Sequence, residues 1–404
     1  MFSKPNRILQ MMAGAVMATA VFASAQDPAP AATPAAAPAA AQAPATPAPA
    51  TPPPAPTWSV GPMDLSGFID GYYSFNFNRP NTTDGFDQIN QLYNFNDKTD
   101  QFELSAAKLT LNHDPDPIGA HVDFIYGRTN TLINAAPTNA TSADQIPYIE
   151  QAFLSLKPPK AKGFELDFGK FVTSAGAEVI EAKDNWNYSR SLLFVNAIPY
   201  WHFGARTSIP VSKTDTVGFQ LVNGWNNVSK SNGGVTGVFT NALVKPKASW
   251  FLNDIIGPEN ANTTSGLRNL FDTTLLLTPP GKTNAYINFD YGMNQDAVAA
   301  QGDTLTHSWY GVAFAAHIQA NGKSAITPRF EWFDDPDGFQ TGLGQTLYEG
   351  TFTYEYKWVE GLLTRIEYRI DASNKNYFNK LANQSVSQQQ TLTVAFIAFF
   401  GPKR

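Results

Sequence analysis

The feature that most constrains this chain is a side-chain alternation of period two that recurs along most of its length. In residues 163–173, GFELDFGKFVT, Phe164, Leu166 and Phe168 alternate with polar residues and glycine. Successive side chains of a β-strand point to opposite faces, so such a run predicts a strand with one apolar and one polar face. The alternation alone fits both a soluble sandwich and a membrane barrel.

The same pattern predicts about sixteen strands. Proline inside a central strand would remove a ladder hydrogen bond, so Pro246 belongs to a turn at residues 245–247, and two strands flank it. The predicted strands are residues 65–78, 106–112, 120–127, 147–157, 163–173, 199–211, 216–225, 235–244, 248–256, 270–277, 285–292, 308–318, 325–333, 346–358, 362–370 and 391–400.

The connections between these strands alternate in length. Short joints rich in Pro, Gly, Asp and Lys are typical of tight turns, and they lie at residues 114–119, 157–163, 210–215, 279–282, 320–323 and 359–361. Long polar loops lie between them, at residues 79–100, 128–146, 173–198, 226–235, 257–269, 294–306, 335–345 and 372–389. This organisation indicates an all-β, antiparallel, up-and-down transmembrane barrel with short periplasmic turns and long extracellular loops.

Composition supports this interpretation and excludes several classes of site. No segment after residue 25 has the roughly 18 continuous apolar residues of a membrane helix. The chain has no cysteine, which excludes disulfides and thiolate metal sites, and its net charge of −6 gives no reason to expect nucleic acid as a partner. The five histidines show no metal-ligand spacing, so no metal or other cofactor is expected.

Three segments are predicted. Lys4 and Arg7 precede an apolar run, and the small residues 23–25 fit a cleavage site, so residues 1–25 read as a secretory signal peptide. Residues 26–57 are almost wholly Ala, Pro and Thr, which predicts a disordered linker, and contact with the cell wall is one of the roles left open for it. Residues 58–404 form the predicted barrel.

The apolar face is expected to meet outer-membrane lipid. Aromatic residues crowd the ends of the runs, as at Tyr73, Trp358, Tyr200 and Trp201, which is consistent with girdles at the two interfaces.

The polar face is expected to line a channel, because sixteen strands enclose an aqueous lumen. A hairpin closing at residues 359–361 predicts that Glu355 lies near Arg365, and Glu349 near Arg369. The alternative is that these charges only solvate an inner wall. The pore-lining candidates are Asp70, Asp123, Asp167, Arg206, Arg329, Glu331, Glu355, Arg365, Glu367 and Arg369.

Several segments resemble a known family. These are GFIDGYYSFNFN, then GKFVTSAGAEVIEAKDNWNYSRSLLF, PYWHFGARTSIPV and VGFQLVNGW. They resemble the β-barrel porins of the OmpL-like type from Gram-negative bacteria over nearly the whole chain after residue 60. The resemblance implies an outer-membrane, porin-like barrel, and it brings no substrate.

The function expected is passive diffusion of small hydrophilic solutes or ions through a channel in the bacterial outer membrane, and trimerisation is left open. One alternative is a non-conducting structural or adhesive barrel. Another is an outer-membrane hydrolase, for which the His307–Ser308 pair is the sole candidate, since no Gly-x-Ser-x-Gly is present. No catalytic residue is predicted.

The longest loop, residues 173–198, lies between the fifth and sixth predicted strands. One hypothesis is that it folds inward and narrows the channel, and the other is that it forms an outward cap. Its charged residues are the constriction candidates: Glu178, Glu181, Lys183, Asp184 and Arg190.

Overall fold

The computed structural model describes residues 59–60, 62–80, 88–134, 146–297, 305–381 and 384–402. All of these belong to one compact unit within residues 36–404. The predicted signal peptide and the whole of the predicted linker lie outside the described residues. In the part of the chain that is described, no helix is long and apolar enough to cross a membrane.

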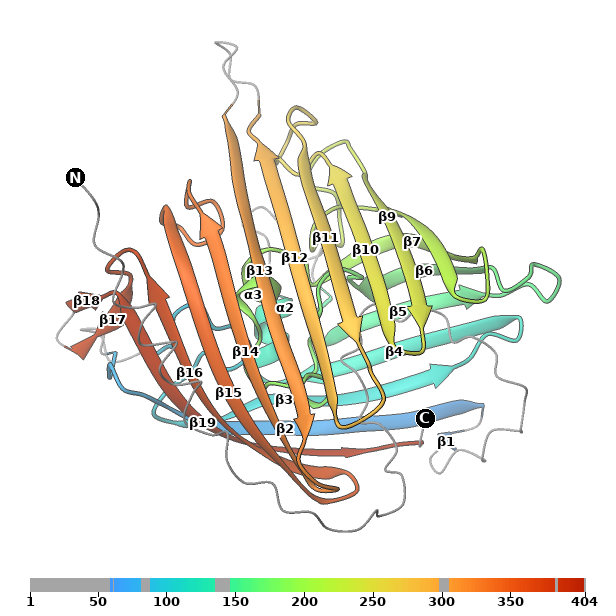
Figure 1. Ribbon diagram of the computed structural model, residues 1–404. Coiled ribbons are helices and arrows are strands. Elements are labelled where there is room, and N and C mark those ends of the chain that lie inside the picture. Colours follow the sequence, from blue (N-terminus) through green and yellow to red (C-terminus); the bar gives the residue numbers. More distant parts are fainter. Residues whose placement is uncertain are drawn as a thin grey trace. The chain divides into compact units, whose positions relative to one another are not determined.

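Sixteen antiparallel strands of the described residues form one closed sheet (Figure 1). Each strand pairs with its neighbours in sequence, and the last strand pairs with the first, with Thr391 opposite Asn76. The sixteen are β2 (Met63–Asn76), β3 (Phe102–His113), β4 (Ile118–Tyr126), β5 (Ile149–Leu156), β6 (Glu165–Val172), β7 (Trp201–Pro210), β8 (Asp215–Val222), β9 (Thr236–Lys245), β10 (Ala248–Gly257), β11 (Arg268–Leu277), β12 (Thr283–Gln295), β13 (Thr306–Gln319), β14 (Ser324–Asp335), β15 (Gln345–Val359), β16 (Leu362–Ser373) and β19 (Gln388–Phe400). The predicted barrel is confirmed.

Short elements lie outside this ring of strands or in its loops. β1 (Ser59–Val60) pairs with the start of β2. Three short helices lie in long loops: α2 (Arg128–Ile133), η2 (Ala182–Asp184) and α3 (Leu192–Asn196). β17 (Phe378–Lys380) and β18 (Gln384–Val386) form a small hairpin in the last long loop.

The predicted alternation of short turns and long loops is also confirmed. Residues 246–247 alone join β9 to β10, so the turn inferred from Pro246 is correct. The short turns therefore lie at one end of the barrel and the long loops at the other (Figure 1).

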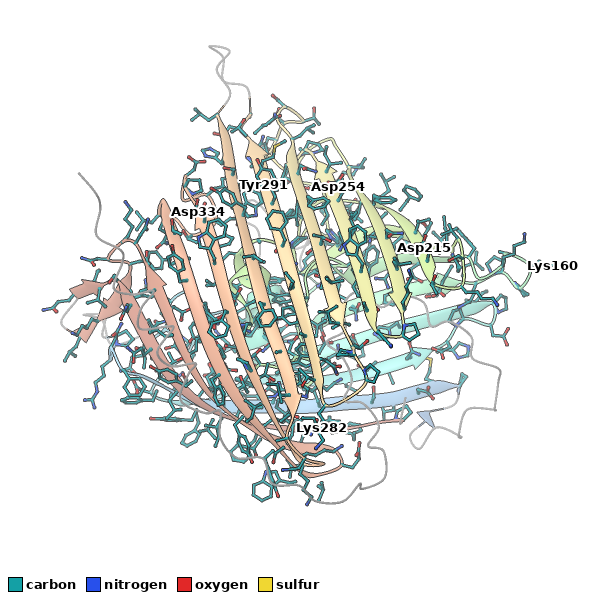
Figure 2. All side chains as sticks on the ribbon, viewed as in Figure 1. Lys160, Asp215, Asp254, Lys282, Tyr291 and Asp334 are labelled. Atoms are coloured by element: carbon teal, nitrogen blue, oxygen red, sulfur yellow. The ribbon has the colours of Figure 1, made fainter. Side chains whose placement is uncertain are left out.

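The outward face of the sheet is apolar between its two ends. Phe168, Phe219, Phe352 and Phe396 are each at least half exposed, as lipid-facing side chains of an isolated barrel must be. Figure 2 shows the side chains on the ribbon, with Lys160 and Lys282 at the short turns. The inward face carries the polar residues, most of them buried.

The expected girdle role of Tyr200 and Trp201 is wrong. The Tyr200 ring packs against Phe95 at 5.4 Å and Phe194 at 5.6 Å, which are both loop residues. Trp201 is 4% exposed, and its indole N–H donates to the Ile133 carbonyl at 2.7 Å. These two aromatic residues are covered by loops at the start of β7 rather than facing lipid.

Pro328 interrupts one ladder within the barrel. β13 and β14 pair at Ala315–Arg329 and again at Ile318–Ile326, and the two positions between are unpaired. Proline has no N–H to donate, so a gap at this point is expected. The neighbouring Thr327 carbonyl instead accepts a hydrogen bond from the Asn187 side chain at 3.1 Å, which brings a loop residue to this wall.

Candidate functional site: the inward loop and the wall that holds it

The loop between β6 and β7, residues 173–200, lies inside the barrel, where Figure 1 shows α3 surrounded by strands. We call this segment the inward loop. Its large side chains Trp186, Tyr188, Leu192 and Leu193 are at most 4% exposed. Trp186 stacks on Tyr286 of β12 at 5.4 Å and on His317 of β13 at 5.6 Å. Aromatic and aliphatic residues in this polar insert therefore pack against the inner wall.

Two wall carboxylates accept the backbone N–H groups of the inward loop. Glu331 of β14 accepts from Leu192 at 3.0 Å and from Leu193 at 3.2 Å. Glu367 of β16 accepts from Tyr188 at 2.6 Å and from Ser189 at 2.9 Å. Each carboxylate satisfies two consecutive donors that burial would otherwise leave without a partner.

Three wall arginines donate to the carbonyl groups of the same loop. Arg365 of β16 donates to Asn187 at 3.2 Å and to two further carbonyls, those of residues 182 and 185. Arg369 donates to the Arg190 carbonyl at 2.7 Å, and Arg329 of β14 to the Ser189 carbonyl at 2.6 Å. The wall thus offers both acceptors and donors, which lets irregular backbone be buried inside the barrel.

The loop contributes charges and hydroxyl groups of its own. Glu178 pairs with Arg329 at 2.7 Å, and the Tyr188 hydroxyl donates to Asp70 of β2 at 2.8 Å. Ser191 caps α3, its hydroxyl accepting from the Phe194 N–H at 3.0 Å. Burial lowers the pKa of Arg190, whose guanidinium lies 4.8 Å from the Phe95 ring and donates to the Tyr188 carbonyl at 2.6 Å.

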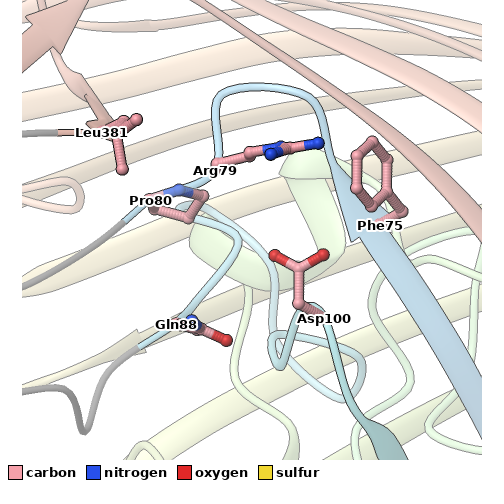
Figure 3. Close-up of a pocket in the computed structure, with 6 residues that line it drawn as sticks. All are labelled: Phe75, Arg79, Pro80, Gln88, Asp100 and Leu381. Carbon is pink, nitrogen blue, oxygen red and sulfur yellow. The ribbon is translucent and has the colours of Figure 1, made fainter.

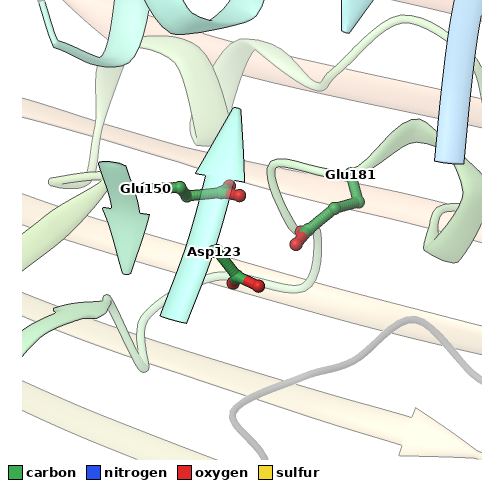
Figure 4. Close-up of side chains that lie close together, drawn as sticks. All are labelled: Asp123, Glu150 and Glu181. Atoms are coloured by element: carbon green, nitrogen blue, oxygen red, sulfur yellow. The ribbon is translucent and has the colours of Figure 1, made fainter. Parts of the chain in front are cut away.

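Three carboxylates converge where the loop meets β3 and β4. Oxygens of Asp123, Glu150 and Glu181 lie within 4.8 Å of one another, and Figure 4 shows the three side chains pointing together. The ammonium of Lys108 contacts all three, at 2.8 Å from Asp123 and from Glu150. This arrangement resembles a cation site in its ligands, but Lys108 already occupies the position that a metal ion would take.

The ten pore-lining candidates all lie on strands, on the inward face. Seven are at most 6% exposed: Asp70, Asp123, Arg329, Glu331, Arg365, Glu367 and Arg369. Six of these bind the inward loop or each other, and Asp123 pairs with Lys108. The side chains of Asp167, Arg206 and Glu355 keep 10%, 27% and 22% exposure. Contact of these residues with a solute stays a prediction.

The pairings inferred from the last hairpin are confirmed. Glu355 lies directly opposite Arg365, with Oε2 to Nη2 at 2.8 Å, and Glu349 lies 3.6 Å from Arg369.

The five constriction candidates divide into two groups. Glu178, Glu181 and Arg190 point to the wall or into the loop itself. Lys183 and Asp184 pair with each other at 2.5 Å and keep 29% and 35% of their side-chain surface exposed.

Several residues of this site were not predicted. Lys108 could have been found, because it stands in the inward phase of a strand whose outward residues are leucines. Asn187 and Tyr188 gave no such signal, since their partners lie more than 100 residues away in sequence.

The candidate hydrolytic pair does not form a catalytic arrangement in the described residues. His307 contacts Asp296 at 3.1 Å and stacks on Phe339. Ser308 is the next residue of β13 and points to the opposite face, as alternation requires. No hydrogen bond joins the two side chains in this part of the structure.

One further hollow lies at the outer end of β2. Its volume is about 290 Å³, and Figure 3 shows Arg79 and Asp100 in it beside Phe75. The remaining lining residues are Pro80, Gln88 and Leu381. None of these six holds the inward loop.

Comparison with solved structures shows the same fold at low sequence identity. The outer-membrane expressed OmpT of Vibrio cholerae has a TM-score of 0.54 at 10% identity, covering 84% of this chain and 97% of that one. The outer membrane channel DcaP of Acinetobacter baumannii has 0.54 at 10%, covering 85% and 99%. An anion-selective porin from Comamonas acidovorans has 0.53 at 11%, covering 84% and 99%.

No curated protein sequence matches the chain. A family model does, however, and it spans residues 62–400, which is nearly the whole of the barrel. Together with the closed sheet of sixteen strands and its apolar outer face, this match places the chain in the bacterial outer membrane as a porin-like channel protein. It belongs to the family described as "Putative beta-barrel porin-2, OmpL-like".

Proposed function

We propose that this barrel passes small hydrophilic solutes and ions by passive diffusion, and that the inward loop narrows the passage. The proposal rests on one observation: the loop is bonded to the inner wall on β2, β3, β8 and β11–β16, and no such bond reaches β4 or β5 among the described residues. Inner-face residues of β4–β7, such as His121, Phe153 and Arg206, remain partly exposed. A passage lined by these residues and by Lys183 and Asp184 of the loop would carry charges of both signs.

The test is the conductance of the purified protein in a planar lipid bilayer. Deleting residues 177–187 removes Glu178, Glu181 and Lys183 and should raise the single-channel conductance. A deletion of residues 298–303, between β12 and β13, is the control and should leave it unchanged. An unchanged conductance in the first deletion would mean that the loop does not limit the flow.

A structural or adhesive barrel is the alternative function. It is favoured by the many buried charges that hold the loop, because they leave little inner surface exposed. Folded protein that never conducts would contradict the porin proposal and support this alternative.

We further propose that the protein has no catalytic role, because among the described residues no nucleophile lies beside His307. Esterase activity that is lost in a Ser308→Ala variant would contradict this.

Two partners are proposed besides lipid and solute. One is a second and third copy of this chain, since the OmpT of Vibrio cholerae also has a trimer form. The other is the cell wall, reached through residues 26–57. Chemical cross-linking of the purified protein tests the first, and sedimentation of residues 26–57 with peptidoglycan tests the second.

A further inference from the structure

We propose that Arg206 binds an anion at the inner face of β7, which the inward loop leaves partly exposed. The ligand that we propose is a small organic carboxylate. The inference rests on the proposed function, because a solute must first reach the inner face of β7.

The Arg206 guanidinium is held rigidly. Its Nε donates to Asp167 Oδ2 at 2.8 Å, and the two residues are directly opposite each other on β7 and β6. Asp167 is itself fixed by the Ser155 hydroxyl, which donates to Oδ1 at 2.5 Å. The guanidinium lies 5.0 Å from the Phe153 ring and 4.5 Å from the Phe171 ring. A carboxylate and two aromatic rings therefore set the orientation of its plane.

Two glycines neighbour this pair on the same two strands. Gly169 and Gly204 are opposite each other on β6 and β7, in the same phase as Asp167 and Arg206. A Cβ at Gly169 would lie 2.8 Å from Phe153 Cα, and the φ angle of Gly169, +142°, disfavours other residues. A Cβ at Gly204 would lie 2.7 Å from Val222 Cα. The wall thus has no side chain at two adjoining positions next to the Asp167–Arg206 pair.

The two terminal nitrogens of the Arg206 guanidinium, which form a planar fork of N–H groups, are available to a ligand. Nε is used by Asp167, and Nη1 and Nη2 have no hydrogen-bond partner among the described residues. Just over a quarter of the side chain is exposed. By contrast, Arg329, Arg365 and Arg369 are at most 2% exposed and donate to the inward loop.

The geometry selects the ligand class. The parallel N–H groups of a guanidinium match the two oxygens of a carboxylate. Asp167 cancels the charge of Arg206, so recognition depends on hydrogen bonding more than on a long-range field. A single guanidinium suits a monoanion, whereas phosphate groups are usually held by several cations. His121 stacks on Phe153 at 5.0 Å, and the edges of these rings offer an apolar contact for the rest of the ligand.

The experiment is a calorimetric titration of the folded, detergent-solubilised protein with benzoate, benzyl alcohol and inorganic phosphate. Benzoate should bind more tightly than either of the others. In the double variant Asp167→Asn, Arg206→Gln, the net charge of the pair is kept and the fork is lost, so benzoate should bind at least about tenfold more weakly. Arg206→Lys, which keeps the charge without the planar fork, should also bind more weakly than wild type.

The matched control is Asp97→Asn, Arg128→Gln. Arg128 has a similar exposure of 24%, but its Nε and Nη2 both already donate to Asp97. This variant should bind benzoate as wild type does.

Equal benzoate binding by wild type and by the Arg206 double variant would overturn the proposal, as would tighter binding of phosphate or benzyl alcohol. Because the titration does not require conduction, the two proposals fail separately. A protein that conducts but does not bind benzoate refutes only this inference, and one that binds but never conducts refutes only the proposed function.

Discussion

At the scale of single residues, five charged side chains of the described inner wall hold the backbone of the inward loop: Arg329, Glu331, Arg365, Glu367 and Arg369. Arg329 has side-chain exposure of 0%, with Glu178 at 2.7 Å, Glu349 at 3.2 Å and Glu331 at 3.3 Å. Removing such charges from water is costly, and the cost is offset only where each group finds several well-placed partners. Arg329 meets this condition because it also donates to the Ser189 carbonyl.

Replacing Arg329 by Met should therefore be strongly destabilising. It leaves three carboxylates without their shared cation, and we expect a loss of about 3–5 kcal/mol. Denaturant unfolding in micelles measures the loss. Lys357→Met is the control, because its pair with Glu360 at 2.8 Å is largely exposed, and it should cost less than about 1 kcal/mol. Equal losses in both variants would contradict this account of Arg329.

The local sequence predicts an ion pair between two inward-facing side chains only when a hairpin brings the two residues together. Glu355 and Arg365 were paired correctly because ten residues and one turn separate them. The contact between Arg329 and Glu178 spans 151 residues, and no short-range pattern encodes it. For the same reason the sequence left the direction of loop 173–198 open.

At the scale of elements, strands and loop follow different rules. Period-two alternation and turn residues specify each strand locally, so all sixteen strands were predicted. The inward loop has short helices and irregular backbone, and its place depends on the wall. Glu181 ties this loop to β3 through Lys108.

The ion pair between Glu181 and Lys108 predicts that the stability of the protein depends on pH. Burial by itself would raise the pKa of Glu181, but Lys108 outweighs it and lowers the pKa below its ordinary value of 4.5. The ion pair should therefore be fully stabilising above pH 4.5 and should be lost as pH falls through the lowered pKa. His121, Asp123 and Glu150 also face this group.

The measurement compares wild type with Glu181→Gln. The difference in their free energies of unfolding should be constant from neutral pH to about pH 4.5 and should shrink in stronger acid. A difference that grows as the pH falls would have the wrong sign and would exclude this role for Glu181.

At the scale of the whole molecule, closure decides whether the sheet can exist in lipid. The pairing of β19 with β2 leaves no strand edge among the sixteen, and lipid offers no partner for an open edge. The sequence predicts no strand in residues 26–57.

Truncation at the two ends should therefore have opposite effects. A chain lacking residues 26–57 should still form a barrel that resists sodium dodecyl sulfate until heated, and this tests the predicted boundary of the domain. A chain lacking residues 388–402 should not form such a barrel, because β2 and β16 would both have open edges. Heat-dependent migration on a gel distinguishes the two. Equal resistance of both truncated chains would contradict closure through β19.

The long separation between the inward loop and its anchors also dictates an order of events during biogenesis. Residues 173–200 enter the nascent structure with β6 and β7, but Glu331, Arg365 and Glu367 are made more than 130 residues later. Contacts of this kind form slowly, because distant parts of the chain must first be brought together. On the proposed function the loop narrows the passage last, after insertion of the final strands, and an incompletely inserted chain would transiently be a wider hole in the membrane than the finished protein.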